Sequence, residues 1–231
     1  MSTLQELTAA FAEQYTQRPI PVEGPIDTRP IDITPDTDQF NALWQCVVPE
    51  SRARGNDFHL PLSVAYAHRL CDAYPQADRE LVLVATLLHD TGWAHVDEDR
   101  IISEGFRGDW RQADIRYEHE VQGCEVAKRV LPELGYSDDF VDKVCAIIDG
   151  HDTRQEAHSL EDALMRDADR AWRFDRVGIA LASGWFDQTP DYYTDRLENE
   201  IIPELITEAA IEMARADLAR SRDLLKTAVL R

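Results

Sequence analysis

The chain has 231 residues, and 24 Lys and Arg against 44 Asp and Glu give it a formal charge of −20. This length suits one domain or two small ones and can bury a sizeable core. With 44% apolar residues, the composition is that of a globular protein and excludes a disordered acidic chain. Because the charge repels a phosphate backbone, we expect no binding to a nucleic-acid duplex. A small anionic substrate would need a local arginine or metal ion.

The sequence gives no sign of a membrane segment or of export. Its longest apolar run, residues 81–88, is far shorter than the roughly 20 residues that a membrane span needs. Glu6 and Glu13 occur early without Lys or Arg, unlike the start of a secretory signal. The 4 cysteines are far apart and form no Cys-x-x-Cys pair, which is typical of reduced thiols. We therefore expect a cytoplasmic protein.

Helical patterns dominate from the N-terminus onward. Residues 3–17 predict an amphipathic helix, and the proline-rich residues 18–35 predict an extended, irregular connector. A helix should resume at Asp36, because apolar residues then recur at helical spacing. These residues are Phe40, Leu43, Trp44 and Val47.

Two buried helices are expected next. Pro61, a favoured residue for a first helical turn, predicts a helix start close to it. Its buried face would contain Leu60, Val64, Ala67, Cys71 and Tyr74. Asp78 can cap a second helix that runs to Asp90 and is apolar nearly all round, so it should be central. A buried strand at residues 81–88 is the alternative, but the length and the acidic start favour a helix.

The rest of the chain predicts further helices. Residues 92–115 indicate a loop, followed by a helix over 117–134 that ends at Gly135. Ser137 and Ser159 have the character of helix caps, and a long helix should run from 204 to the end. We thus predict an all-α fold in which residues 1–50 hold a helix, the connector and a short helix. Residues 51–231 would form a helical domain with the C-terminal helices packed on it.

Residues capable of chemistry are expected where helices end. His89-Asp90 closes the central apolar helix, and a charge buried there costs several kcal/mol unless it is paired or bound to metal. His59, His119 and His151 occur at comparable boundaries, and His151 would point inward if its helix continued. Asp167-Ala168-Asp169 lies within the helix that Ser159 caps.

This pattern resembles the HD-domain superfamily of metal-dependent phosphohydrolases. The matching elements are His59 in Asn-Asp-Phe-His, His89-Asp90 in Leu-Leu-His-Asp-Thr-Gly, and Asp169 in Asp-Ala-Asp-Arg. His119 and His151 are similar to two further histidines in the branch of the family that binds two metals. The resemblance covers about residues 52–172 and implies an HD-like helical bundle with a metal site between its central helices.

The resemblance implies one set of metal ligands. His59, His89, Asp90 and Asp169 would hold a first ion, and Asp90 would bridge to a second ion on His119 and His151. Such nitrogen and carboxylate ligands suit two divalent ions of Fe, Mn, Zn or Co. Helical periodicity leaves the choice between Asp167 and Asp169 open, and the family's order favours Asp169. His68, His95 and His158 do not match, and we interpret them as structural or surface residues.

Several residues are candidates for contact with the substrate. Arg154 directly follows His151-Asp152-Thr153, while Arg116 and Arg170 lie near His119 and Asp169. Because arginine can bind phosphate with two hydrogen bonds, we interpret Arg154 as catalytic. Asp90, the proposed bridge between the two ions, is the other residue that we interpret as catalytic. Trp93 stands where many family members have a basic or small polar residue. It would either stack on a base or sugar of the substrate or simply pack.

The resemblance favours hydrolysis of a small phosphate ester or nucleotide by a metal-activated water. The alternative is a di-iron oxygenase of the same family that cleaves a C–C or C–P bond of a small polyol or phosphonate. The metal and the use of O₂ would separate these two reactions. A non-catalytic sensing module is disfavoured, because a site without catalysis would be expected to have lost ligands.

Overall fold

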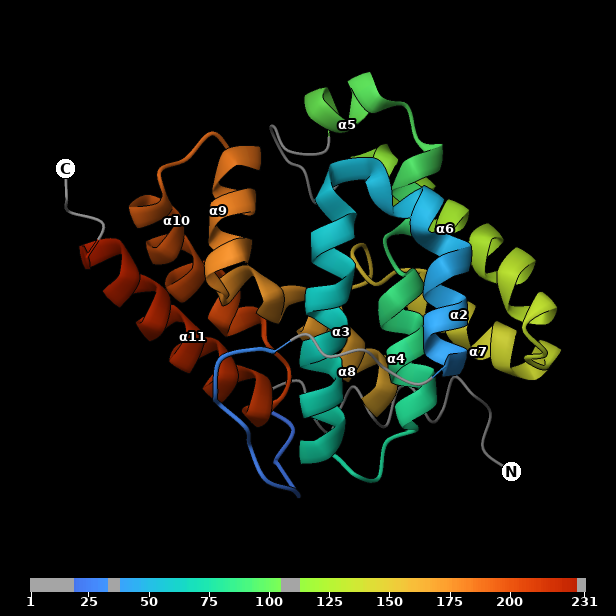
Figure 1. Cartoon of the computed structure of the whole chain (residues 1–231), viewed down its shortest axis with the longest axis horizontal. Helices are drawn as coiled ribbons and strands as arrows, with labels where there is room; N and C mark the ends of the chain where they lie inside the picture. Colours follow the sequence, from blue (N-terminus) through green and yellow to red (C-terminus); the bar gives the residue numbers. More distant parts are fainter. Residues whose placement is uncertain (1–18, 33–37, 105–112, 228–231) are drawn as a thin grey trace.

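The protein is all-α, as predicted. The computed structural model describes residues 19–32, 38–104 and 113–227, and within these ranges no β-strand forms apart from an isolated bridge between Ile20 and Thr207. Its α-helices (Figure 1) are α2 (Asp38–Val47), α3 (Asn56–Ala73), α4 (Arg79–Leu88), α5 (Glu98–Glu104), α6 (Asp114–Glu133), α7 (Asp138–Ile148), α8 (Leu160–Ala171), α9 (Arg176–Trp185), α10 (Pro190–Arg196) and α11 (Glu208–Thr227).

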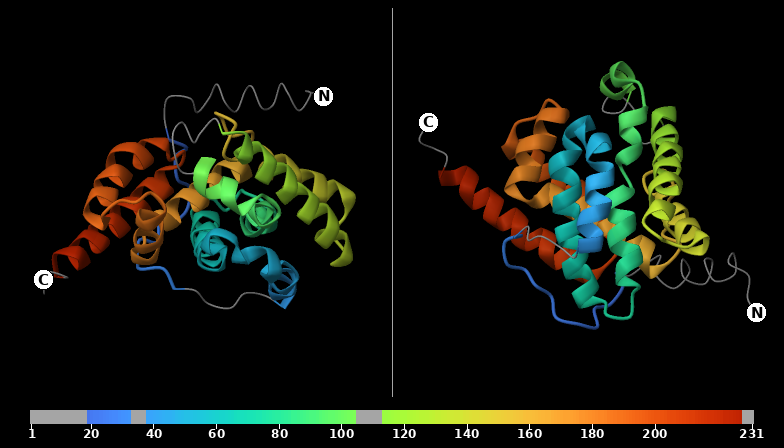
Figure 2. Two further views of the ribbon diagram at one scale, coloured as in Figure 1. Left: turned by 90° about the horizontal axis from the view of Figure 1, so that it is seen from above. Right: turned by 45° about the vertical axis from the view of Figure 1, so that its right-hand side comes forward.

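Three helices form the centre of the molecule. Helices α3, α4 and α8 pack against one another, and α4 also contacts α7 and α6. All residues from Leu81 to Leu88 are buried, so the apolar segment forms a central helix and not a strand. Figures 1 and 2 show α9–α11 beside α3 on one side and α6–α7 beside α4 on the other. The ends of the central helices therefore face residues from both sides.

Side-chain caps fix several helix starts at the predicted positions. Asp78 accepts a hydrogen bond from Leu81 N at 3.2 Å, and Ser159 accepts one from Asp162 N, also at 3.2 Å. Ser137 caps α7 in the same way through Phe140 N. Such caps satisfy amide groups that have no partner within the helix, which is why these residues mark helix starts in the sequence.

Other predicted bounds are wrong. Helix α3 begins at Asn56 instead of near Pro61, because the Asn56 side chain fastens its start to the carbonyl of Asp90 at 2.9 Å. His59 therefore lies inside the first turns of the helix. The predicted loop over 92–115 contains α5 and a short 3₁₀ segment, Thr91–His95. Helix α6 starts at Asp114, three residues before the predicted position, and α11 starts at Glu208.

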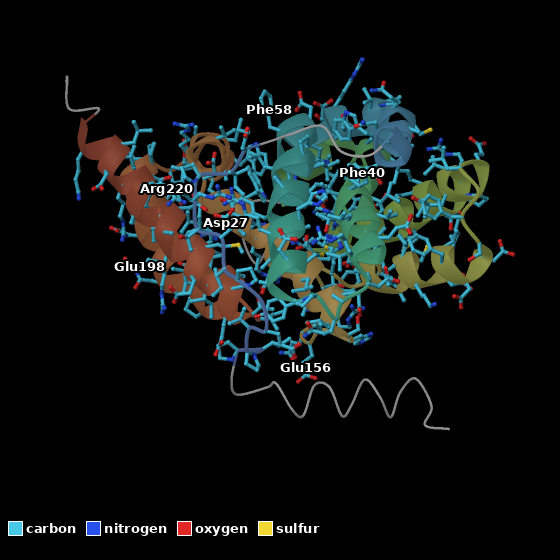
Figure 3. The ribbon with its side chains drawn as sticks, turned by 60° about the horizontal axis from the view of Figure 1, so that its bottom comes forward. Asp27, Phe40, Phe58, Glu156, Glu198 and Arg220 are labelled. Carbon is cyan, nitrogen blue, oxygen red and sulfur yellow. The ribbon has the colours of Figure 1, made fainter. Side chains whose placement is uncertain are left out.

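The connector joins distant parts of the chain. Residues 19–32 are extended and irregular, as expected, and Ile20 bonds to Ile206 O at 2.8 Å and to Glu208 N at 3.1 Å. The Tyr74 hydroxyl donates to Ile20 O at 2.7 Å. Asp27 lies between α3 and α11 (Figure 3) and contacts Arg69 of α3. The connector thus covers the end of α3 and the start of α11.

Parts of the predictions fall outside the described residues. The predicted helix over 3–17 and the predicted start at Asp36 lie there, and so do residues 228–231. The predicted domain boundary near residue 50 stays a prediction. Among the described helices, none is both long enough and apolar enough to cross a bilayer.

Candidate metal centre

The six predicted ligand residues come together between the central helices. His59 lies on α3, His119 on α6 and Asp169 on α8, while His89-Asp90 follows α4 and His151 follows α7. Their side chains are at most 7% exposed. At the outer end of α3, Phe58 projects outward (Figure 3) and is 54% exposed, whereas its neighbour His59 faces the interior.

One group of contacts surrounds Asp169. Its Oδ1 lies 3.0 Å from His59 Nε2 and 3.3 Å from His89 Nε2. Asp90 lies next to this group, because its Oδ1 is 3.7 Å from His89 Nε2. His59, His89 and Asp169 can therefore hold one ion together, with Asp90 next to it.

A second group lies on the other side of Asp90. Its Oδ1 is 3.5 Å from His119 Nε2 and 3.6 Å from His151 Nε2. The two histidine Nε2 atoms are themselves 3.5 Å apart. Asp90 is thus the one carboxylate of the predicted set that contacts histidines of both groups, as the bridging role requires.

The distances within the two groups fit side chains that share a metal ion. Two ligands about 2.0–2.2 Å from a shared ion lie about 2.8–3.6 Å apart when they are adjacent and up to about 4.4 Å apart when they are opposite. The separations in the two groups run from 3.0 to 3.7 Å. Both nitrogens of His59 and Nε2 of His89 are buried and make no hydrogen bond within the described part of the chain. Buried polar atoms normally have partners, so the two Nε2 atoms, which both face Asp169 Oδ1, fit ligands of an ion.

Backbone contacts set the orientation of two of the histidines. His89 Nδ1 lies 2.7 Å from Thr86 O, and His151 Nδ1 lies 2.8 Å from Ile148 O. In each case the ring donates to the carbonyl three residues earlier, which leaves Nε2 as the lone-pair nitrogen directed at the centre. His151 needs no continuous helix for this, because α7 ends at Ile148 and Gly150 adopts a positive φ of 89°.

The charges of the centre strongly affect one another. Burial raises the pKa of Asp90, but His89, His119, His151 and Arg54 outweigh burial and hold that pKa well below its usual range. Burial likewise opposes the charge on His151, yet Asp90, Asp152 and Glu120 raise its pKa to about 9. The cluster therefore attracts positive charge, which in the loaded protein metal ions can supply in place of protons.

The structure distinguishes Asp169 from Asp167. Asp167 accepts hydrogen bonds from Ile206 N at 2.9 Å, from Thr207 N at 2.8 Å and from Thr207 Oγ1 at 2.6 Å. Its carboxylate thus anchors the start of α11. Burial raises the pKa of Asp167 to about 6, against these hydrogen bonds. Asp169 alone of the two contacts the histidines, in agreement with the order of residues in the family.

The residues after His89-Asp90 serve packing. A Cβ atom at Gly92 would collide with the backbone of His119 and Gly123, so glycine lets α6 approach the centre closely. Trp93 is 1% exposed, stacks on His119 at 4.1 Å between ring centroids and donates from Nε1 to Asp90 Oδ1 at 3.0 Å. Of the two alternatives for Trp93, packing is therefore the one observed.

Three arginines lie beside the carboxylates of the centre. Arg54 NH1 is 3.6 Å from Asp90, Arg173 NH2 is 3.9 Å from Asp169, and Arg116 NH1 is 2.5 Å from the carboxylate of Asp152. Arg54 has a positive φ of 54°, a costly conformation for a residue with a side chain, and it stacks over Trp93. Burial lowers the pKa of Arg54, Asp90 opposes that shift, and Arg116 and Arg173 repel its charge.

The predicted role of Arg154 is not supported, and neither is that of Arg170. The Arg154 guanidinium contacts the carbonyl oxygens of Asp149 and Glu156 and bonds to Asp162 at 2.6 Å. Arg170 turns toward Glu204, at 3.8 Å. These contacts direct both side chains away from the histidines. Arg116 is the one residue of the predicted arginine set that the structure brings to the centre.

Sequence reasoning missed four residues beside the centre: Arg54, Arg173, Asp152 and Glu120. Glu120 is 1% exposed and accepts from Asp152 N at 2.9 Å, Thr153 N at 3.1 Å and Thr153 Oγ1 at 2.7 Å. It thereby fastens the turn that carries His151 to α6, directly after His119. A signal existed for Asp152, because His151-Asp152-Thr153 repeats the residues of His89-Asp90-Thr91.

The remaining histidines lie elsewhere. His68 contacts Arg79 at 3.3 Å, and His95 lies 4.0 Å from Glu50. His158 is exposed, and its amide bonds to Asp162. Their interpretation as structural or surface residues agrees with these positions.

Comparison with known families gives one result that bears on this centre. The family model described as HD domain matches residues 59–171, a segment that begins at His59 and includes all six predicted ligands. Comparison with curated proteins and with solved structures gives no significant match.

Proposed function

Because the chain belongs to the HD-domain superfamily, we propose that it is a metal-dependent phosphohydrolase that removes phosphate from a small phosphomonoester or nucleotide. The observation that carries this proposal is a cluster of histidines and carboxylates with arginines beside it, in a protein with a net charge of −20. Arginines gathered beside a candidate metal centre, in so acidic a protein, indicate an anionic substrate.

The charges of the centre support a multiply charged substrate. Asp90, Asp152 and Asp169 each lie within 3.9 Å of an arginine. The negative charges of these carboxylates and the positive charges of the guanidinium groups therefore nearly cancel. The charge of two divalent ions would therefore remain largely uncompensated by the protein. A phosphomonoester dianion supplies the missing negative charge, whereas a neutral polyol does not.

Solvent access favours two of the arginines as substrate ligands. The histidine side chains are at most 3% exposed, but that of Arg173 is 18% exposed and that of Arg54 is 10% exposed. Of the three arginines beside the centre, these two are thus more accessible to solvent than Arg116, which is 4% exposed. Each can donate two parallel hydrogen bonds to phosphoryl oxygens and so orient the ester and stabilise charge that develops on it.

The six predicted ligands would hold two divalent ions, of Fe, Mn, Zn or Co, with Asp90 as the shared residue. When bound, such ions polarise a phosphoryl oxygen and lower the pKa of a water molecule toward neutrality. The protein's own residues fix this centre: Thr86 and Ile148 orient His89 and His151, while Trp93 donates to Asp90. Asp90 is accordingly the residue on which both ions and the reaction depend.

A di-iron oxygenase would use the same six ligands. The arginines disfavour its neutral polyol substrates but are compatible with a phosphonate, so the use of O₂ decides between the two reactions. We therefore place the hydrolase first.

The test is release of inorganic phosphate from a panel of phosphomonoesters by metal-loaded protein, measured in air and without oxygen. We expect equal rates in both atmospheres and no activity for Asp90→Ala. Turnover that consumes O₂ and stops without it would contradict the proposal and favour the oxygenase.

A further inference from the structure

We propose that Asp152 is a ligand of the second metal ion, so that each ion has two histidines and a carboxylate of its own and shares Asp90. This inference rests on the proposed binuclear centre. It adds a seventh protein ligand to the six that the sequence predicts.

The first observation is a repeated local structure. His89-Asp90-Thr91 follows the end of α4, and His151-Asp152-Thr153 follows the end of α7. Both histidines bond through Nδ1 to the carbonyl three residues earlier, at 2.7 and 2.8 Å. Each histidine thus presents Nε2 to the centre, and an aspartate follows it directly. In the first turn this aspartate, Asp90, contacts histidines of the centre. The same local structure places Asp152 next to His119 and His151, the histidines of the second group.

The second observation is the position of the Asp152 carboxylate. Its Oδ2 lies 3.8 Å from His119 Nε2 and 4.0 Å from His151 Nε2. Two ligands of one ion, each about 2.0–2.2 Å from it, are at most about 4.4 Å apart. His119, His151 and Asp152 therefore each offer an atom to one common ion.

The third observation is that the turn is held firmly. Glu120 receives the amides of both Asp152 and Thr153 and the Thr153 hydroxyl, at 2.7 to 3.1 Å. Arg116, whose side chain is 4% exposed, contacts Asp152 Oδ2 at 2.5 Å. Groups that hold a ligating carboxylate in place contribute to the affinity of a metal site, because less order must be gained on binding.

The arrangement around the two ions is then nearly symmetric. His59, His89 and Asp169 form one set, and His119, His151 and Asp152 form the other. Arg173 lies beside Asp169 and Arg116 beside Asp152, so each separate carboxylate has its own arginine. A carboxylate on the second ion makes that position harder in character than two imidazoles alone, and this favours Mn²⁺ or Fe²⁺ over softer ions.

The test is calorimetric titration of metal-free protein with Mn²⁺, comparing wild type with Asp152→Asn. Asparagine keeps the shape of the side chain but removes the anionic ligand. We expect the second Mn²⁺ to bind at least about 100-fold more weakly, while the first keeps its affinity and shows that the fold is intact. Asp149→Asn is the matched control, because it removes the same charge from an exposed residue in the same segment.

The outcomes separate this inference from the proposed function. If wild type binds two ions and Asp152→Asn binds both with unchanged affinity, or if both variants weaken the second ion alike, Asp152 is not a ligand and the six-ligand centre stands. If wild type does not bind two ions, the binuclear centre itself is wrong.

A crystal structure of the wild-type protein with Mn²⁺ gives an independent answer even if the variant does not fold. A carboxylate oxygen of Asp152 should lie about 2.2 Å from the second ion. A separation that leaves room for a water molecule between them would overturn the proposal.

Discussion

Asp167 and Asp169 are two residues apart on α8, and we predict opposite consequences when each is replaced by alanine. Asp167→Ala should destabilise the fold and leave metal binding intact. Asp169→Ala should weaken binding of the first ion and have the smaller effect on the metal-free fold. The comparison is well matched, because both changes remove one buried carboxylate from the same helix.

The magnitude for Asp167→Ala follows from its three hydrogen bonds, to Ile206 N, Thr207 N and Thr207 Oγ1. At about 1 kcal/mol for each bond, the free energy of unfolding should fall by about 3 kcal/mol. For a protein of this size that corresponds to a fall in Tm of about 6–12 °C. The loss should appear equally with and without metal.

The magnitude for Asp169→Ala follows from mass action. An ion at about 100 times its Kd stabilises the native state by about 2.7 kcal/mol. Wild type and Asp167→Ala should therefore both gain this stability when Mn²⁺ is added to metal-free protein. Asp169→Ala should lose the part of the gain that comes from the first ion.

The assay is differential scanning calorimetry of the three proteins in chelator and in Mn²⁺, with bound metal measured in parallel. If Asp167→Ala loses metal while Asp169→Ala keeps both ions, the assignment of these two residues is wrong. The position of Asp169 against His59 and His89 would then have no role in metal binding.

Three further predictions concern residues around the centre. Gly92→Ala should lower the free energy of unfolding by about 3 kcal/mol or more, because the new Cβ meets backbone atoms of α6. Gly184→Ala, where the Cβ meets open space, is the control, and equal denaturation midpoints for the two variants would contradict the prediction. Glu120→Ala should weaken binding of the second ion about 10–100-fold by calorimetry and spare the first, because it frees the His151 turn. Arg173→Gln should raise KM for a phosphomonoester about 10-fold or more without loss of metal, since it removes a charged donor; an unchanged KM would exclude it as a substrate ligand.

The fold was largely predictable because its signals are local. The Asp78 and Ser159 caps act on amides three residues away, and the apolar segment 81–88 is long enough to identify α4. The start of α3 was missed because it depends on a distant contact, from Asn56 to the carbonyl of Asp90. Pro61, a local signal, indicated the wrong position.

The residues that meet at the candidate centre were predictable from their order in the sequence, but their neighbours were not. Asp167 could be excluded only from its bonds to residues about 40 positions further along the chain. Arg154 is adjacent to the His151 segment in sequence, yet Asp162 holds its side chain elsewhere. Arg54 and Arg173 reach the centre from segments without a motif, through conformations that the sequence does not specify, including the positive φ of Arg54.

The count of bound metal ions per chain tests the central claim of a binuclear centre most directly. Elemental analysis of purified wild-type protein loaded with Mn²⁺ and freed of excess metal should give about two ions per chain. His119→Ala removes a ligand of the second ion only, so it should hold about one ion and keep its helical circular dichroism spectrum. A wild-type protein with a single ion, and the same single ion in His119→Ala, would contradict the binuclear centre.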